Sequence, residues 1–352
     1  MAGDPAPSVV EEPDEANPRQ ARSFGNEVLQ REFRVAVVSD LNGRYGSTDY
    51  DARVSAAVER VVAVAPDLVL STGDMVAGQR SGLDYSAMWR AFHEAVSDPL
   101  SEAGIPFAAT PGNHDGSGYP AFAHERSVYV SEWTARRPSL EYVDEAAYPL
   151  RYAFRAGGAL FISLDATTTG PLPSEQRAWL EQVLQAHPSE LTVVFGHVPL
   201  FPFAVGREVE ALRDPELESL LREFDVDLFI SGHHHAYYPG RRGPLRLVGT
   251  ACLGGGPRPL LGQTEARGRS ILLFEIRSNE IVALDAYEGQ AFDERIHRAT
   301  LPPFLGEGPE RIDRDDLPSA ELSGSAFERL TPQRIPALAR SADASSLPLR
   351  TP

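Results

Sequence analysis

The sequence contains no lysine, so all 33 of its basic residues are arginine. A chain without lysine has no Walker A phosphate loop, no Schiff-base lysine and no Ser-x-x-Lys acyl-transfer site. Its single cysteine, Cys252, excludes an internal disulfide framework and a zinc site built from several cysteines. No run approaches the ~18 consecutive apolar residues that cross a bilayer. Several enzyme classes and a membrane-spanning protein are therefore excluded.

Positive charge is also scarce, because 50 acidic residues against 33 basic ones give a net charge of −17 at pH 7. Proteins that bind nucleic acids or anionic membranes need a cationic face. We therefore expect neither as a partner, and the sequence does not define an oligomeric state. A length of 352 residues is compatible with one large α/β domain carrying tails.

The two ends of the chain differ from its middle in composition. Residues 1–28 form an acidic, proline-rich leader with no apolar signal-peptide core, and residues 301–352 form a proline-rich tail; both are predicted to be mostly disordered. A short helix is compatible with residues 320–330, and the folded domain is expected to span 29–300. The chain as written is predicted to be soluble and cytoplasmic. A leader of this kind also remains after a signal peptide or lipid anchor is removed, and the sequence does not separate these two histories.

Apolar runs alternate with amphipathic segments through the middle of the chain. Helices are expected at 51–65, 85–100 and 174–186. Strands are expected at 33–39, 67–72, 106–110, 150–154, 159–164, 191–195, 227–231, 245–248, 271–276 and 281–286. The early strands are separated by helices and the late ones are not. This order predicts an α/β fold with a mostly parallel open sheet that passes into antiparallel pairs.

Five of the predicted strands end in a short group of Asp, Asn or His residues. These groups are Asp40-Leu41-Asn42, Gly73-Asp74, Gly112–Asp115, Gly196-His197 and Gly232–His235. Ligands of open α/β sheets collect beyond the carboxyl ends of the strands. Carboxylate, amide and imidazole together suit divalent Mn, Fe, Zn or Ni. We expect a metal site here, and a bridging carboxylate would allow a second metal ~3.5–4 Å from the first, the arrangement that clamps a phosphoryl group.

The residue types in these groups and their order along the chain resemble the motifs of the calcineurin-like metallophosphoesterase superfamily. Its pattern of D-x-H, GD, GNH followed by D or E, GH and GHxH is matched here by SDLN, TGDM, PGNHD, FGHVP and SGHHH. The stretch GHHHAYYPG also resembles the purple acid phosphatase branch. The resemblance implies a four-layer α/β/β/α sandwich, with two mixed sheets flanked by helices and the metal site at the carboxyl ends of strands.

The resemblance also implies two divalent metal ions, with Mn, Fe or Zn expected, and a role for each motif residue. Asp74 would bridge the two metals, and His114 would be the catalytic acid that protonates the leaving group or positions the phosphoryl oxygen. The remaining ligands would be Asp40, Asn42 and His235 at the first metal and Asn113, His197 and His233 at the second.

Two positions depart from the family pattern. Asn42 stands where the family has a histidine, and an amide oxygen is a poorer ligand than imidazole for Zn or Fe. Asn42-Gly43 is also typical of a simple turn, so both interpretations stay open. Purple acid phosphatases place a tyrosine three residues after the bridging aspartate, where this chain has Ala77. Tyr45, close after Asn42, is a candidate to supply the missing ligand at the first metal.

Three further residues near the motifs carry alternatives. Asp115 is either a partner that orients His114 or a loop carboxylate. His234 is either a packed or solvent-exposed residue or a phosphate contact. Arg241 is either a phosphate contact or part of a solvated turn.

The main functional hypothesis is a phosphoric ester hydrolase that attacks phosphorus with a metal-bridging hydroxide on a binuclear site. Its substrate would be a small or macromolecular phosphomonoester or phosphodiester, which the sequence does not identify. The alternative is a catalytically weakened metal-binding or interaction protein on the same fold.

Overall fold

The computed structural model describes residues 32–188 and 190–318. The predicted leader and the possible helix at 320–330 lie outside these residues. Within the described part, no helix combines the length and the apolar character needed to cross a membrane.

The first of two mixed sheets contains the early strands of the chain. Its strands are β1 (Phe33–Val38), β2 (Leu68–Ser71), β3 (Phe107–Ala109), β11 (Ile271–Arg277), β12 (Glu280–Glu288) and β13 (Glu294–Arg295). They are ordered β13-β12-β11-β1-β2-β3 among the described residues. β1 to β3 run parallel, whereas β11 pairs antiparallel with both β1 and β12. The change from parallel to antiparallel pairing that the sequence predicts is therefore confirmed for this sheet.

The second sheet is larger and has a parallel centre. Its strands are β4 (Glu141–Ala147), β5 (Arg151–Ala156), β6 (Ala159–Ser163), β7 (Leu191–Gly196), β8 (Leu228–Ser231), β9 (Tyr238–Arg242), β10 (Leu245–Gly249), β14 (Phe304–Leu305) and β15 (Ile312–Arg314). Their order is β14-β15-β9-β10-β8-β7-β6-β5-β4. β6, β7, β8 and β10 run parallel to one another, and the flanking pairs are antiparallel.

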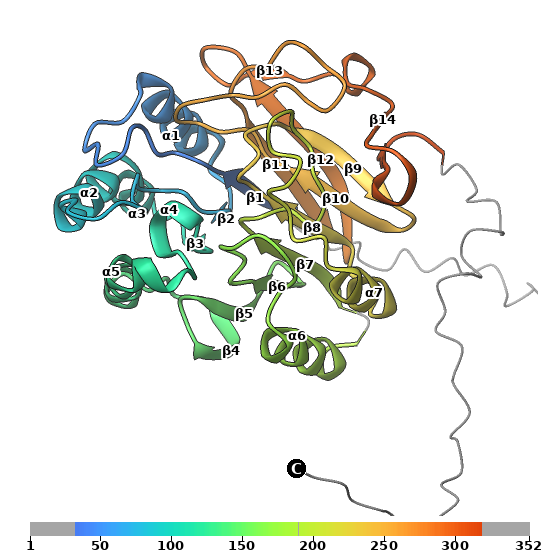
Figure 1. The fold of residues 1–352 in the computed structure, drawn as a ribbon, viewed down its shortest axis with the longest axis horizontal. Coiled ribbons are helices and arrows are strands. Elements are labelled where there is room, and N and C mark those ends of the chain that lie inside the picture. Colours follow the sequence, from blue (N-terminus) through green and yellow to red (C-terminus); the bar gives the residue numbers. More distant parts are fainter. Residues whose placement is uncertain (1–31, 189, 319–352) are drawn as a thin grey trace, which may run out of the picture.

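Helices cover the outer face of each sheet, as Figure 1 shows. The helices by the first sheet are α1 (Ala52–Val64), α2 (Tyr85–Phe92), α3 (Asp98–Glu102), α4 (Asn113–Gly116) and α5 (Ala123–Ala135). Those by the second sheet are α6 (Ser174–Ala186) and α7 (Pro215–Glu223). The result is the four-layer α/β/β/α arrangement that the family resemblance implies.

The alternation of side chains along β1 explains why the sheets stack. Val35 and Val37 belong to the apolar cluster that lies between the sheets and continues to α6 and α7. Ala36 and Val38 belong to a second cluster with the helices α1, α2 and α5. Successive side chains of a strand point to opposite faces, so a strand that is apolar at every position is buried on both sides.

The helix predicted at 85–100 is interrupted by a π-helical turn at His93–Ser97. The N–H of Asp98 donates to the carbonyl of His93, five residues back. Pro99 has no N–H and its ring would crowd the carbonyl four residues before it, so a local change of hydrogen-bond register follows. Sequence periodicity did not predict α5, α7, β4 or β9.

The folded part also extends beyond the expected boundary at residue 300. β14 pairs with β15, and β15 pairs with β9, so residues 304–314 form the edge of the second sheet. The sequence did not predict these strands because Pro302 and Pro303 precede them, and proline usually argues against a strand. Beside a short edge strand, however, proline leaves the ladder of hydrogen bonds intact.

The buried His93 predicts a pH dependence of stability. His93 is 2% exposed and packs against Trp89 and Trp133. Burial, and then the guanidinium of Arg136, lower the pKa of His93 to about 4. The unfolded chain therefore takes up a proton below pH ~6.5 and the folded chain only near pH 4. Between those values the parent should lose up to about 3 kcal/mol of unfolding free energy through His93, and His93→Gln should lose correspondingly less.

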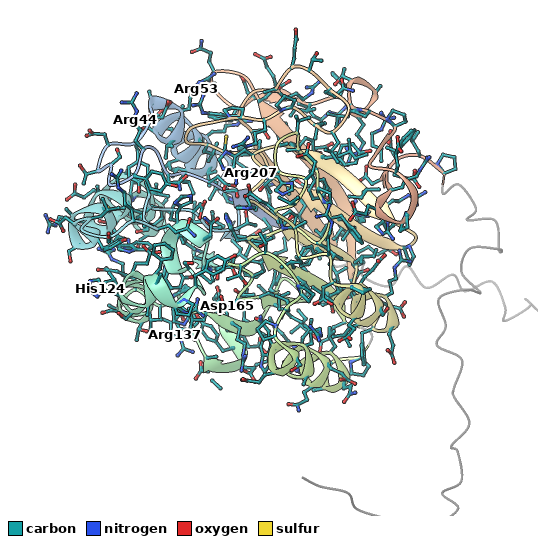
Figure 2. All side chains as sticks on the ribbon, in the orientation of Figure 1. Arg44, Arg53, His124, Arg137, Asp165 and Arg207 are labelled. Atoms are coloured by element: carbon teal, nitrogen blue, oxygen red, sulfur yellow. The ribbon has the colours of Figure 1, made fainter. Side chains whose placement is uncertain are left out.

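The measurement is urea unfolding at several pH values. The charged neighbours of His93, namely Asp98, Glu132 and Arg136, remain in the variant, so the difference curve isolates the imidazole. His124→Gln changes an exposed histidine at the edge of the molecule (Figure 2) and should follow the parent. If the free energy of unfolding changes with pH by the same amount in the parent and in His93→Gln, His93 is not the source of the pH dependence.

Candidate metal centre

The five polar groups predicted from the sequence meet at one edge of the two stacked sheets. Each follows the carboxyl end of a parallel strand, namely β1, β2, β3, β7 or β8. Backbone hydrogen bonds join the loops. The N–H of Asp40 donates to the carbonyl of Gly73 at 3.0 Å, and that of Asn42 donates to the carbonyl of Asp74 at 3.1 Å. The N–H of Gly232 donates to the carbonyl of His197 at 3.0 Å. The site is therefore built from both sheets at once.

Close backbone approach in this region requires glycine. A Cβ on Gly112 would lie 2.1 Å from the nitrogen of Asp74, and one on Gly73 would lie 2.6 Å from the nitrogen of Gly112. Asp40 and Asp74 have φ angles of 49° and 57°, in the left-handed region that non-glycine residues seldom adopt. Such strained residues concentrate at functional sites, where the surrounding structure holds them in place.

His197 lies at the middle of the group. Its Nε2 is 2.8 Å from Oδ1 of Asn113, 3.4 Å from Oδ1 of Asp74 and 3.2 Å from Nδ1 of His233. Asp40, Asp74 and His197 are all buried, and each offers a ligand atom within 4.8 Å of the others. His235 joins from the other side, with Nε2 3.1 Å from Oδ1 of Asp40.

The donor set of this group suits a cation. Nδ1 of His197 faces the carbonyl of Thr72 at 2.8 Å, and Nδ1 of His235 faces that of Gly256 at 3.0 Å. Because carbonyls only accept hydrogen bonds, both Nδ1 atoms donate, and in neutral imidazole each Nε2 then presents a lone pair to the centre. Oδ1 of Asp40 is buried, and its polar neighbour is Nε2 of His235 at 3.1 Å rather than a backbone or hydroxyl donor. Imidazoles that converge on a buried carboxylate oxygen are the chemistry of a metal site.

Electrostatics in the group follow from burial opposed by ion pairing. Burial by itself raises the pKa of Asp74, but the neighbouring His197 and His114 outweigh it and hold that pKa well below its usual range. Burial likewise lowers the pKa of His197, but the carboxylate of Asp74 outweighs it and raises the pKa to about 9. Burial also raises the pKa of Asp40, but His235 and His197 outweigh it and hold that pKa below its usual range. Both aspartates are thus held as anions, which is the form that binds a metal.

A cavity of about 410 Å³ opens onto this group. It is lined by Asn42, Gly43, Arg44, Tyr45, Asp51, Asp74, Ala77, His114, Arg207, His233, His235, Gly254 and Gly255. Potential metal ligands, imidazoles and arginine side chains share its wall, so it has the size and chemistry for a small anionic ligand.

Comparison with known proteins assigns the family. A model of calcineurin-like phosphoesterases matches residues 33–237, more than half of the chain. The chain belongs to the calcineurin-like phosphoesterase family. It is 29% identical to purple acid phosphatase 18 of Arabidopsis thaliana over 174 residues, which cover 48% of this chain and 38% of that protein. It is also 29% identical to a probable cyclic nucleotide phosphodiesterase of Synechococcus over 203 residues, covering 56% and 69%.

Solved structures agree with this calcineurin-like fold. The purple acid phosphatase from yellow lupin (Lupinus luteus) seeds is 15% identical with a TM-score of 0.56, covering 76% of this chain and 53% of that one. A dimetal phosphatase from Danio rerio is 16% identical with a TM-score of 0.52, covering 75% and 98%. The chain spans less than half the length of the first purple acid phosphatases that it matches in sequence.

The positions where this calcineurin-like chain departs from the family pattern lie on the cavity wall. The Asn42 side-chain nitrogen donates to the carbonyl of Val76 at 3.5 Å. Tyr45 is 55% exposed, and its ring centre is 5.3 Å from that of His114. Tyr45 thus stands at the rim of the cavity against His114, outside the buried group. Ala77 also lines the cavity.

Asp115 does not orient His114. Its carboxylate accepts hydrogen bonds from the backbone N–H groups of Met75, Val76 and Gly112, at 2.7 to 3.0 Å. Nδ1 of His114 instead faces the carbonyl of Gly78 at 3.1 Å. Asp115 therefore holds together the loops after β2 and β3.

His234 and Arg241 both lie outside the cavity wall. His234 is fully buried. Its Nδ1 accepts from the N–H of Phe203 at 3.0 Å and its Nε2 donates to the carbonyl of Glu210 at 2.9 Å, so it is a packed residue, one of the two alternatives that the sequence left open. Arg241 lies on β9, donates to the carbonyl of Leu317 and does not line the cavity. The phosphate contact considered for Arg241 therefore finds no support in the lining of this cavity.

Sequence reasoning missed two residues that contact the candidate ligands. Oε2 of Glu210 lies 3.0 Å from Nε2 of His233, and Oε1 of Gln79 accepts from the amide of Asn113 at 2.9 Å. The contact with His233, together with the charge of Arg207, outweighs burial, which by itself would raise the pKa, and lowers the pKa of Glu210 to about 2. Neither residue belongs to a motif, so only the fold reveals them.

The geometry predicts that Asp74→Asn loses bound metal more completely than Asn42→Ala. Asp74 is a buried charge inside the group, whereas Asn42 is a neutral residue on the cavity wall. We expect Mn²⁺ affinity to fall at least about 10-fold in Asp74→Asn, the lower end of the loss caused by removing partners of metal ligands. Metal analysis after equilibrium dialysis measures it.

Asp165→Asn is the matched control, since Asp165 pairs with Arg126 outside the group and should retain the parent's metal. Asparagine at position 74 can still accept the hydrogen bond from the backbone N–H of His114, so the loop has no reason to open. Equal metal retention by Asp74→Asn and Asn42→Ala would refute the central place given to Asp74.

Proposed function

We propose that this chain is a metal-dependent phosphoric ester hydrolase with two divalent metal ions. Asp74 would lie between them. The other ligands would be Asp40, Asn42 and His235 at the first metal and Asn113, His197 and His233 at the second. Family membership and the phosphatase and phosphodiesterase names of the relatives support the class of reaction.

The observation that carries the proposal is the convergence at His197. Nε2 of His197 faces carboxylate, amide and imidazole atoms at 2.8 to 3.4 Å. A proton on His197 stabilises this group of acceptors, and a bound metal cation would replace that proton, since metal binding to imidazole releases it. Divalent ions bound there would polarise the phosphate and lower the pKa of an attacking water.

The protein's own groups have separable tasks in this proposal. Glu210 accepts the Nε2 proton of His233 and so leaves Nδ1 free to face the centre. Gln79 fixes the amide of Asn113 with its oxygen toward His197. His114 donates Nδ1–H to Gly78, and its Nε2 faces the cavity, 4.0 Å from Oδ2 of Asp74. Nε2 of His114 is therefore placed to give a proton to the oxygen of the departing alcohol.

The first site is rich in oxygen. Asp40, Asn42 and Asp74 offer carboxylate and amide oxygens beside the single imidazole of His235. Such a set suits Mn²⁺ better than Zn²⁺ or Fe²⁺, because carboxylate and carbonyl oxygens suit Mn, whereas imidazole suits Zn and Fe. We therefore propose Mn²⁺ as the first metal to test.

His114→Ala should lower turnover without lowering metal content. With an alkyl phosphate, whose alkoxide needs a proton to leave, the rate should fall about 10²- to 10⁴-fold. With nitrophenyl phosphate the loss should be much smaller, because nitrophenolate leaves as a stable anion. Steady-state kinetics on both esters, together with metal analysis, measure this.

His124→Ala is the control, since it changes an exposed histidine of α5 outside the cavity. If His114→Ala loses metal and both esters suffer alike, His114 is a ligand and the acid role fails. If the metal-loaded parent hydrolyses neither ester, the alternative of a weakened metal-binding protein on this fold replaces the proposal.

A further inference from the structure

Two loops that no motif includes run side by side next to the candidate ligands. The N–H of Val205 donates to the carbonyl of Pro259 at 2.9 Å, and the N–H of Leu261 donates to that of Phe203 at 2.9 Å. The loop after β7 and the loop after β10 thus form a short paired segment. It carries one arginine on each side, Arg207 and Arg258.

The paired loops are tied to the GHxH segment. The N–H of Arg258 donates to the carbonyl of His235 at 3.3 Å. His234 bonds to Phe203 and to Glu210, which bracket Arg207 in the chain. The two arginines are therefore held at a set position relative to His233 and His235. Figure 2 shows Arg207 near the centre of the molecule, whereas Arg44 lies toward its edge by α1.

The two guanidinium groups lie close together. A Cβ on Gly206 would be 3.6 Å from an Nη atom of Arg258. Burial, and then the charge of Arg207, lower the pKa of Arg258. Arg207 pairs with Glu210, but no carboxylate of the described chain lies within ion-pair distance of Arg258. Two positive charges thus share one negative charge beside the cavity.

Hydrogen-bond donors also remain unused there. The Nε atoms of Arg207 and Arg258 are both buried, and neither has a hydrogen-bond partner among the described residues. Arg207 lines the cavity together with Asp74, His233 and His235. Buried donors without partners cost free energy, so the guanidinium of Arg207, which lines the cavity, calls for an acceptor there, whereas Arg258 lies behind it. An anion with several oxygens satisfies both the charge and the donors.

We propose that Arg207, supported by Arg258, binds the anionic oxygens of the phosphate group in this cavity. The inference rests on the proposed phosphoesterase function and adds the residues that recognise the substrate's charge. Arg207 presents its guanidinium to the phosphate. Arg258 adds positive charge behind it, and Glu210 holds Arg207 in place while it contacts His233.

The probe is inorganic phosphate, titrated calorimetrically into the Mn²⁺-loaded protein. Arg207→Gln should weaken phosphate binding about 10- to 100-fold, the loss expected for one hydrogen bond to a charged group. Arg258→Gln should weaken it less, and Arg207→Lys should restore part of the loss because it keeps the charge without the planar fork. Where turnover is measured, KM should rise more than kcat falls.

Arg213→Gln is the matched control, because Arg213 belongs to the same loop but pairs with Glu310 and does not line the cavity. Metal content is measured for every variant, since Arg207 also contacts Glu210. If Arg207→Gln loses metal, Arg258→Gln decides the question, because it leaves the pair of Arg207 with Glu210 in place.

The outcomes separate this inference from the function on which it rests. Phosphate affinities of Arg207→Gln and Arg258→Gln within twofold of the parent overturn the inference, even if the parent hydrolyses esters. A parent that binds no phosphate overturns it as well. A parent that binds phosphate in an Arg207-dependent way but hydrolyses no ester supports the inference and overturns the hydrolase proposal.

Discussion

The burial of two carboxylates in one small volume is the constraint on which this structure depends. Asp40 and Asp74 are almost completely buried and contribute to the same candidate metal group. Two unpaired anions in an apolar interior would cost several kcal/mol each. The protein offsets this with imidazoles from both sheets, with backbone N–H groups directed at the carboxylates, and with a donor set open to a metal cation.

That constraint also accounts for the local backbone. To direct a carboxylate back across the strand end, the chain turns sharply at Asp40 and Asp74 and adopts left-handed conformations there. The neighbouring loop must then pass so close that only glycine fits at position 112. Asp115 secures this crossing with three backbone hydrogen bonds. A residue that resembles a catalytic partner in the sequence therefore serves to hold the loops on which the ligands stand.

The family motifs supply the candidate metal centre, and the loop after β7 adds contacts to it that no motif includes. The side chain of His234 attaches the GHxH segment to this loop, because it accepts from the backbone N–H of Phe203 and donates to the carbonyl of Glu210. Glu210 then joins a candidate metal ligand, His233, to a cavity-lining arginine, Arg207. Under the two proposals, one carboxylate, that of Glu210, would couple the orientation of a metal ligand to the recognition of the substrate's charge.

The sequence by itself determined most of the strands, the order of the polar groups and the family. These features are local: a buried strand is an apolar run, and a sharp turn after it needs Gly, Asp or Asn. Most predicted strands and the helix at 174–186 have matching elements in the structure, and the polar groups meet at the predicted strand ends.

Only the tertiary structure decided which side chains contact one another across loops. The backbone role of Asp115, the displacement of Arg241 to β9, the contact of Glu210 with His233 and the pairing of residues 304–314 with β9 all join segments distant in the chain. Such contacts depend on how two sheets stack and where loops cross, and no local pattern of residues encodes that geometry.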